Sequence, residues 1–144
     1  MSPYGNLLRS FCWLPFVQIQ ASIPPTAPLL PASTSFSDSE QSEGASELDS
    51  SLPSPPPSIQ LTPLLGSAPT EHIQTLHSLY ASQAATLVWL SGEARGEERK
   101  PVIVGIALRK EEVWDEVKER KTFMGVMKML KELLTQQSSW LHEG

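Results

Sequence analysis

The alternation of residue types predicts two strands in the second half of the chain. The stretch 102–108, VIVGIAL, is uncharged and carries apolar residues at every position except its glycine. Because successive side chains of a strand point to opposite faces, both faces of this strand are apolar and are expected to be covered. The pattern therefore predicts a central strand. A second strand is expected at 59–65, and Pro63 would confine it to an edge or end its pairing there.

Apolar residues at three- to four-residue spacing predict two helices. The first is expected from about residue 70 to 86, with Ser67 as a cap and Pro69 tolerated near its start. The sequence TLVWL that follows fits either a continuation of this helix or an extended segment. The second helix is expected over 119–135, after a charged loop at 91–100 with two glycines. Its apolar face comprises Phe123, Val126, Met127, Leu130 and Leu134.

The first half of the chain has a different character. Residues 1–22 are apolar, and within them 16–21 alternate well enough for one short strand. Residues 23–58 are rich in proline, serine and acidic residues and are expected to be a disordered linker, because they bury too little apolar surface to offset the entropy of ordering. The linker serines between acidic residues suit acid-directed kinases, and the alternative is an inserted loop without a task. The folded domain is then 59–136, followed by a frayed tail at 137–144.

Charge and length narrow the class of protein. The chain has 144 residues and a net charge of −5, which fits one ordinary domain and argues against a nucleic-acid footprint. A single cysteine, Cys12, excludes an internal disulfide and fits a reducing compartment. Arg9 ahead of an apolar run imitates a signal peptide, but Pro15 interrupts that run. No stretch approaches the roughly 20 apolar residues of a membrane span, so the expected location is the cytoplasm, with the nucleus as a second compartment.

The sequence offers no constellation for catalysis, cofactor binding or metal binding. His72 and His77 are five residues apart, whereas two metal ligands on one helix face are four apart, and His142 lies in the tail. Cys12 has no basic partner in its own segment that would make it a nucleophile. The glycines of the loop at 91–100 have acidic neighbours that would repel a phosphate. The chain is therefore expected to be no enzyme, without catalytic residues, cofactor or metal.

Two apolar residues are candidates for contact with a partner protein, Trp114 and Met124. Trp114 stands in a strongly charged run, where contact with a partner and packing on the sheet are equally good interpretations. Met124 belongs with Met127 and Met129 to a group of methionines that would suit an adaptable partner groove, although core filling is the simpler interpretation.

The order strand, helix, strand, helix predicts a small α+β fold with a mixed, antiparallel-rich sheet packed by two helices. Two strands alone cannot cover a strand that is apolar on both faces, nor supply neighbours on both of its edges. The sheet is therefore expected to be incomplete in 59–136. It would be completed by the N-terminal segment, by another chain, or by residues beyond this sequence.

Several short motifs in this order resemble the C-terminal half of the fungal-type proteasome assembly chaperone 3 family. They are LTPLLGS before the first helix, LYASQ within it, VIVGIAL in the second strand and FMGVMKMLKELL in the second helix, so that the similarity covers about residues 59–135. The resemblance implies a non-enzymatic chaperone that forms a heterodimer with a similar partner and helps α-subunits of the proteasome core particle to assemble into a ring. The family expects several strands before these motifs, where this chain offers only 16–21. The alternative is a small dimerising scaffold or adaptor of another complex.

Overall fold

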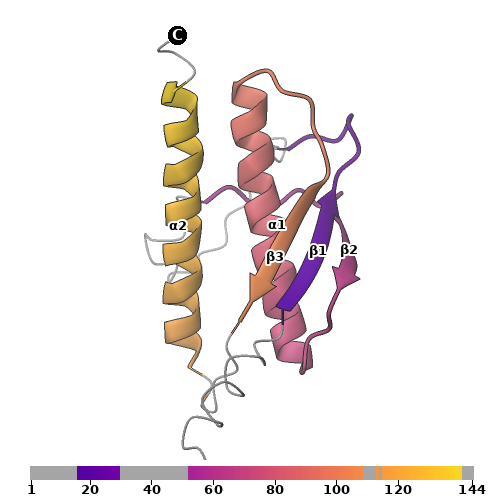
Figure 1. Cartoon of the computed structure of the whole chain (residues 1–144), viewed down its shortest axis with the longest axis vertical. Helices are drawn as coiled ribbons and strands as arrows, with labels where there is room; N and C mark the ends of the chain where they lie inside the picture. Colours follow the sequence, from indigo (N-terminus) through magenta and orange to yellow (C-terminus); the bar gives the residue numbers. More distant parts are fainter. Residues whose placement is uncertain (1–15, 30–51, 109–112, 114, 141–144) are drawn as a thin grey trace, which may run out of the picture.

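The computed structural model of the chain describes residues 16–29, 52–108, 113 and 115–140, with the side chains of 138–140 left out. Three strands and two helices follow one another in the order β1, β2, α1, β3 and α2 (Figure 1). Their bounds are Phe16–Ser22 for β1, Gln60–Leu65 for β2, Glu71–Ala94 for α1, Val102–Ala107 for β3 and Glu116–Trp140 for α2. The fold is α+β, with an antiparallel three-stranded sheet packed against two helices, as the sequence predicts.

The sheet has the order β2-β1-β3, and β1 is antiparallel to both neighbours. The predicted short strand in the N-terminal segment is thus the central strand of the sheet. The prediction that 102–108 forms a central strand is wrong, because β3 pairs only with β1 in the part of the chain that the structure describes. The prediction that Pro63 confines its strand to an edge is confirmed, since β2 is the other edge.

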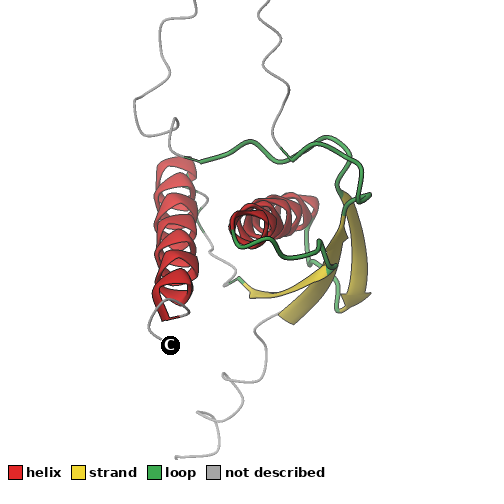
Figure 2. Cartoon of the chain, turned by 90° about the horizontal axis from the view of Figure 1, so that it is seen from above, coloured by secondary structure: helices red, strands yellow, loops and turns green. Residues whose placement is uncertain are grey.

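One face of the sheet is buried and the other is exposed. Val17, Ile19 and Ala21 of β1 point into the core, while Gln18 and Gln20 between them belong to the outer face. Ile103 of β3 also lies on the outer face and is 60% exposed. The expectation that both faces of 102–108 are covered is therefore not met by the described residues, because both helices lie on one side of the sheet (Figure 2).

Helix α1 covers the buried face and supplies most of the core. It begins at a cap formed by Thr70, whose side chain accepts a hydrogen bond from the backbone N–H of Ile73 at 3.3 Å. The helix continues through TLVWL and into the predicted loop, ending at Ala94 before Gly96, which has a φ of 73°. The buried apolar residues of α1 are Tyr80, Ala81, Ala85, Leu87 and Trp89.

Helix α2 packs on α1, and its Met127 joins Ile19 of β1 and Ile106 of β3 in one core cluster. Met127, 1% exposed, is the anchor of this contact, and the ring of Phe123 meets that of Tyr80 edge-on with centroids 5.1 Å apart. Residues 116–118, before the predicted start at 119, belong to the helix as well, and the Asp115 carboxylate caps its first turn by accepting from the N–H of Val117 at 3.0 Å. No helix in the described ranges is long and apolar enough to cross a bilayer.

Both ends of the predicted linker pack on the domain. Leu29 is buried in a cluster with Trp89 of α1, and the side-chain amide of Gln83 donates to the carbonyl of Pro53 at 2.8 Å. The folded unit therefore includes 16–29 and 52–58 in addition to the predicted domain. Residues 30–51, which carry the serine- and acid-rich sequence, lie outside the described residues.

Candidate partner-binding site

An apolar groove lies between β3 and α2. It has a volume of about 490 Å³ and its floor is formed by α1. The groove forms because the backbone of α2 lies beside α1, to one side of the β3 edge (Figure 2). The groove is lined by Tyr80, Ala84 and Val88 of α1, by residues 102–108, and by Thr122, Val126, Met127 and Leu130 of α2.

The lining, as far as it is described, carries no charged side chain. Its polar side-chain groups are the hydroxyls of Thr122 and Tyr80, and the pKa of Tyr80 is raised by burial and by the nearby carboxylate of Glu119. All seven residues from 102 to 108 take part, so the groove follows the whole length of the unpaired edge. A strand laid beside β3 would find backbone partners on one side and apolar side chains beneath it.

The surface of α2 extends this apolar area. Val126, Met129 and Leu133 recur at three- and four-residue spacing and are 36%, 59% and 60% exposed. Residues so spaced lie on one face of a helix. Since Val126 lines the groove, the stripe of Val126, Met129 and Leu133 continues the groove along the outer side of α2.

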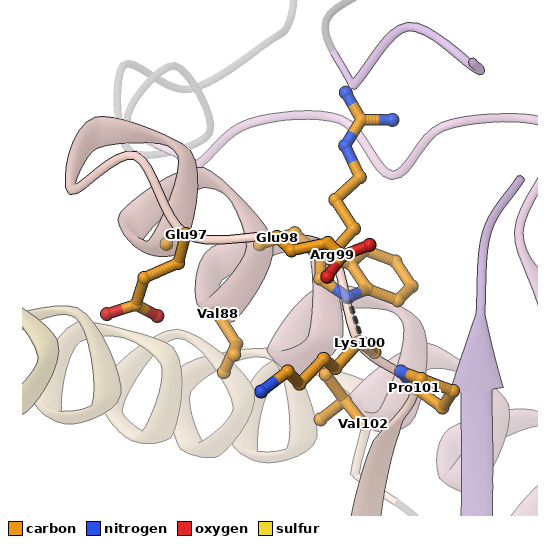
Figure 3. Close-up of a pocket in the computed structure, with 9 residues that line it drawn as sticks. Val88, Glu97, Glu98, Arg99, Lys100, Pro101 and Val102 are labelled. Atoms are coloured by element: carbon orange, nitrogen blue, oxygen red, sulfur yellow. Dashed lines mark hydrogen bonds between the residues drawn. The ribbon is translucent and has the colours of Figure 1, made fainter. Parts of the chain in front are cut away.

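A second hollow, of about 480 Å³, lies where α1 ends and β3 begins (Figure 3). The indole N–H of Trp89 donates to the carbonyl of Lys100 at 2.8 Å, which ties the loop before β3 to α1. The Arg95 guanidinium donates to Glu97 at 2.7 Å; this bond raises the pKa of Arg95 and lowers that of Glu97. Exposed pairs of this kind contribute little to stability. The polar groups are used to hold the loop, which favours a structural role for this hollow.

A third hollow, of about 320 Å³, lies between the first turns of α1 and strands β1 and β2. His77 borders it and is 2% exposed, and its Nε2 has no hydrogen-bond partner among the described residues. Desolvation lowers the pKa of His77. One histidine without a second chemical group does not make a reactive site, and the described residues contain no group of three or more potential metal ligands.

The structure describes one of the two predicted contact residues. Trp114 lies outside the described residues. Met124 is half-buried on α2 and is not among the residues that line the groove, since it stands two positions before Val126 and so on another side of the helix. Of the neighbouring methionines, Met127 fills the core and Met129 is exposed.

The edge of β3 was not identified as a site from the sequence. The sequence does contain a signal for this site, because residues 102–108 are apolar on both faces. That pattern predicts burial between two neighbouring strands. Comparisons of the chain with models of known protein families, with curated proteins and with solved structures give no match.

Proposed function

We propose that the chain is a non-enzymatic subunit that pairs with a structurally similar partner protein, and that the pair assists assembly of the α-subunit ring of the proteasome core particle. The observation that carries the pairing is the outer edge of β3, which pairs with no strand among the described residues and lies above the apolar groove. The proposal requires no catalytic step, metal or cofactor. Cytoplasm and nucleus are the compartments that it implies.

The chemistry of the edge supports binding of an added strand. An unpaired strand edge presents a row of N–H and C=O groups that another strand can pair with, and natural proteins usually guard such edges with charges, prolines or bulges. Strand β3, VIVGIA, has no charge and no proline, and it pairs with β1 in an unbroken register. The side chains that an added strand directs inward would enter the groove and be removed from water.

The assembly role rests on the resemblance of the sequence motifs. LTPLLG forms β2 and the turn after it, LYASQ lies in α1, and VIVGIAL contains β3, so the motifs fall on elements rather than on loops. These motifs are apolar and moderately specific. A small dimerising scaffold of another complex is the second candidate. A groove lined by uncharged groups can accept a strand, but its chemistry does not select one particular partner.

The test is co-expression with candidate partner chaperones and proteasome α-subunits, followed by purification of the complex. We expect a soluble heterodimer that Val126→Asp disrupts, because this change places a charge in the groove. Val117→Asp is the matched control, since Val117 is 77% exposed and lies nine residues before Val126, on the opposite side of α2.

Three outcomes separate the candidates. A heterodimer that is sensitive to Val126→Asp and recruits α-subunits supports the full proposal. Recovery of a different complex with the same sensitivity favours the scaffold alternative. Binding that Val126→Asp and Val117→Asp affect equally would contradict the groove as the site.

A further inference from the structure

The outer face of the sheet has an unusual composition for a surface that faces water. An antiparallel sheet with one solvated face alternates apolar residues inside with polar and charged residues outside. The pairing of the three described strands places no charged residue on the outer face. The residues on this face are Phe16, Gln18, Gln20 and Ser22 of β1, Gln60, Thr62 and Leu65 of β2, and Ile103, Gly105 and Ala107 of β3. The composition is that of a surface that is covered.

Apolar residues of this face gather at the end where β1 begins. Phe16 lies opposite Ala107, and a Cβ built on Gly105 would come within 3.2 Å of two atoms of the Phe16 ring, so the ring lies over that glycine. Leu65 lies opposite Gln18, on the other side of β1. Phe16 and Leu65 are 48% and 57% exposed. We call Phe16, Leu65, Gly105 and Ala107 the outer patch, and an exposed apolar patch of this kind indicates a surface that binds another segment.

The chain has an apolar segment directly beside the outer patch. Residues 11–14, FCWL, are separated from Phe16 by Pro15 alone. Proline has no N–H and cannot continue the pairing of a strand that has neighbours on both sides. The sequence therefore favours a turn out of the sheet at Pro15. Because both helices lie on the other side of the sheet, the outer face is the one left open to this segment (Figure 2).

We propose that residues 11–14 fold back over the outer patch and cover it with the side chains of Phe11, Trp13 and Leu14. The segment is long enough, because an extended residue spans about 3.3 Å and neighbouring strands lie about 4.8 Å apart. A segment joined to the border of the patch acts at an effective concentration of about 1 mM or more, which favours it over a second copy or another protein. The contact removes apolar surface of the segment and of the patch from water.

This inference does not rest on the proposed function. The partner strand would lie beside β3 in the plane of the sheet, whereas residues 11–14 would lie on its outer face. Ile103, opposite Gln20, is outside the outer patch and nearer the other end of β1. Loss of one contact can therefore be measured without loss of the other.

The only cysteine of the chain, Cys12, lies within the proposed segment and serves as a natural probe. A thiol reacts with an aromatic disulfide reagent only when the reagent can reach it, so the rate reports how often the segment opens. We expect Cys12 of the full chain to react at least about tenfold more slowly than the same cysteine in a peptide of residues 8–16, because the segment must open first. The rate should not depend on the protein concentration.

Matched substitutions locate the surface that protects Cys12. Leu65→Asp places a charge in the outer patch and should return the rate to that of the peptide. A nearby negative charge by itself disfavours the thiolate and slows the reaction, so a faster reaction reports opening. Trp13→Ser changes the segment and leaves the described fold untouched, and it should have the same effect. Leu133→Asp is the control, because Leu133 is 60% exposed on α2, and it should leave the rate unchanged.

The outcomes either support the proposal or overturn it. Slow reaction of Cys12 that Leu65→Asp and Trp13→Ser accelerate and Leu133→Asp does not would support it. A rate equal to that of the peptide would show that the segment does not pack. Protection that Leu65→Asp and Leu133→Asp change equally would place the segment elsewhere. Protection that falls on dilution, with a dimeric mass in light scattering, would assign the outer patch to a second copy.

Discussion

The two edges of the sheet are built in opposite ways. Strand β2 contains Pro63, which has no N–H to donate, and its register with β1 shifts between Gln18 and Ile19. Strand β3 has neither feature and pairs with β1 over six consecutive positions. Proline and irregular pairing both keep a strand edge from accepting a new neighbour. The sequence of β2 therefore hinders pairing at its outer edge, whereas the outer edge of β3 can pair with another strand.

The largest effect is expected at the end of the closed edge. Gly66 has a φ of 78°, and a Cβ at this position would lie 2.2 Å from the carbonyl oxygen of Phe16. Gly66→Ala should therefore lower the free energy of unfolding by about 3 kcal/mol or more, measured by urea denaturation. Gly96→Ala is the control, because Gly96 has a φ of 73° with no atom within 4 Å of its Cβ position, and it should cost only about 1 kcal/mol. Equal costs would show that the close approach to Phe16 is unimportant.

The second prediction concerns the wall of the groove at the open edge. Met127 is 1% exposed and holds α2 on α1, so Met127→Ala should lower the free energy of unfolding by about 2–3 kcal/mol. Partner binding should weaken as well, because α2 forms one side of the groove. Met129→Ala, at a residue that is 59% exposed, should change stability by less than about 0.5 kcal/mol. A stable Met127→Ala variant would contradict the assignment of Met127 as the anchor.

The third prediction compares the edges directly. Ile103 of β3 and Thr62 of β2 are both exposed on the outer face, so a lysine at either position should change stability by less than about 0.5 kcal/mol. Ile103→Lys should weaken partner binding about tenfold, or about 1.4 kcal/mol, because it guards the open edge with a charge. Thr62→Lys should leave the affinity unchanged. If calorimetry shows the reverse order, the partner binds at β2.

The smallest effect is expected from pH. Burial lowers the pKa of His77 below its ordinary value of 6.5, so the unfolded chain binds a proton more readily than the folded chain. The free energy of unfolding should therefore fall as the pH drops below 6.5 and level off below the folded-state pKa. His77 borders the hollow beneath Leu61 and Pro63, so acid should weaken the β2 side of the sheet first.

The variant His77→Leu isolates this histidine. It removes the unpartnered Nε2, which should stabilise the chain by about 1 kcal/mol at neutral pH, and it should flatten the acid limb of a urea titration. An unchanged pH profile of His77→Leu would assign the acid sensitivity to other groups.

The helices and the strand order along the chain could be predicted, while the arrangement of the strands in the sheet could not. The spacing of apolar residues indicates which segments form α1 and α2, because a helix buries one stripe. The predicted end of α1 and the predicted start of α2 differ from the observed ones, which are Ala94 and Glu116, because packing and capping residues determine where a helix ends. The strand in 16–21 was recognised as a short alternating segment, but nothing local shows that its backbone pairs on both sides.

The candidate site was missed for a related reason. Ile103 is apolar on the outer face of β3, and Val102 and Val104 are apolar on its core face. This sequence pattern is the same whether the neighbouring strand belongs to the same chain or to another. The groove depends on how α2 sits on α1, and this follows from packing at Met127 rather than from the pattern of β3. The residue type of Met124 suggests contact with a partner, but its position on the helix places it on another side than the groove.

The central claim is that the backbone of β3 is open on one side until another strand binds. Amide hydrogen exchange of residues 102–107, followed by NMR with and without the partner protein, tests it most directly. The account predicts that every second amide of β3 exchanges rapidly in the chain alone, because only alternate residues donate to β1, and becomes protected when the partner protein is present. Slow exchange of all these amides in the chain alone, or no gain of protection on binding, would contradict it.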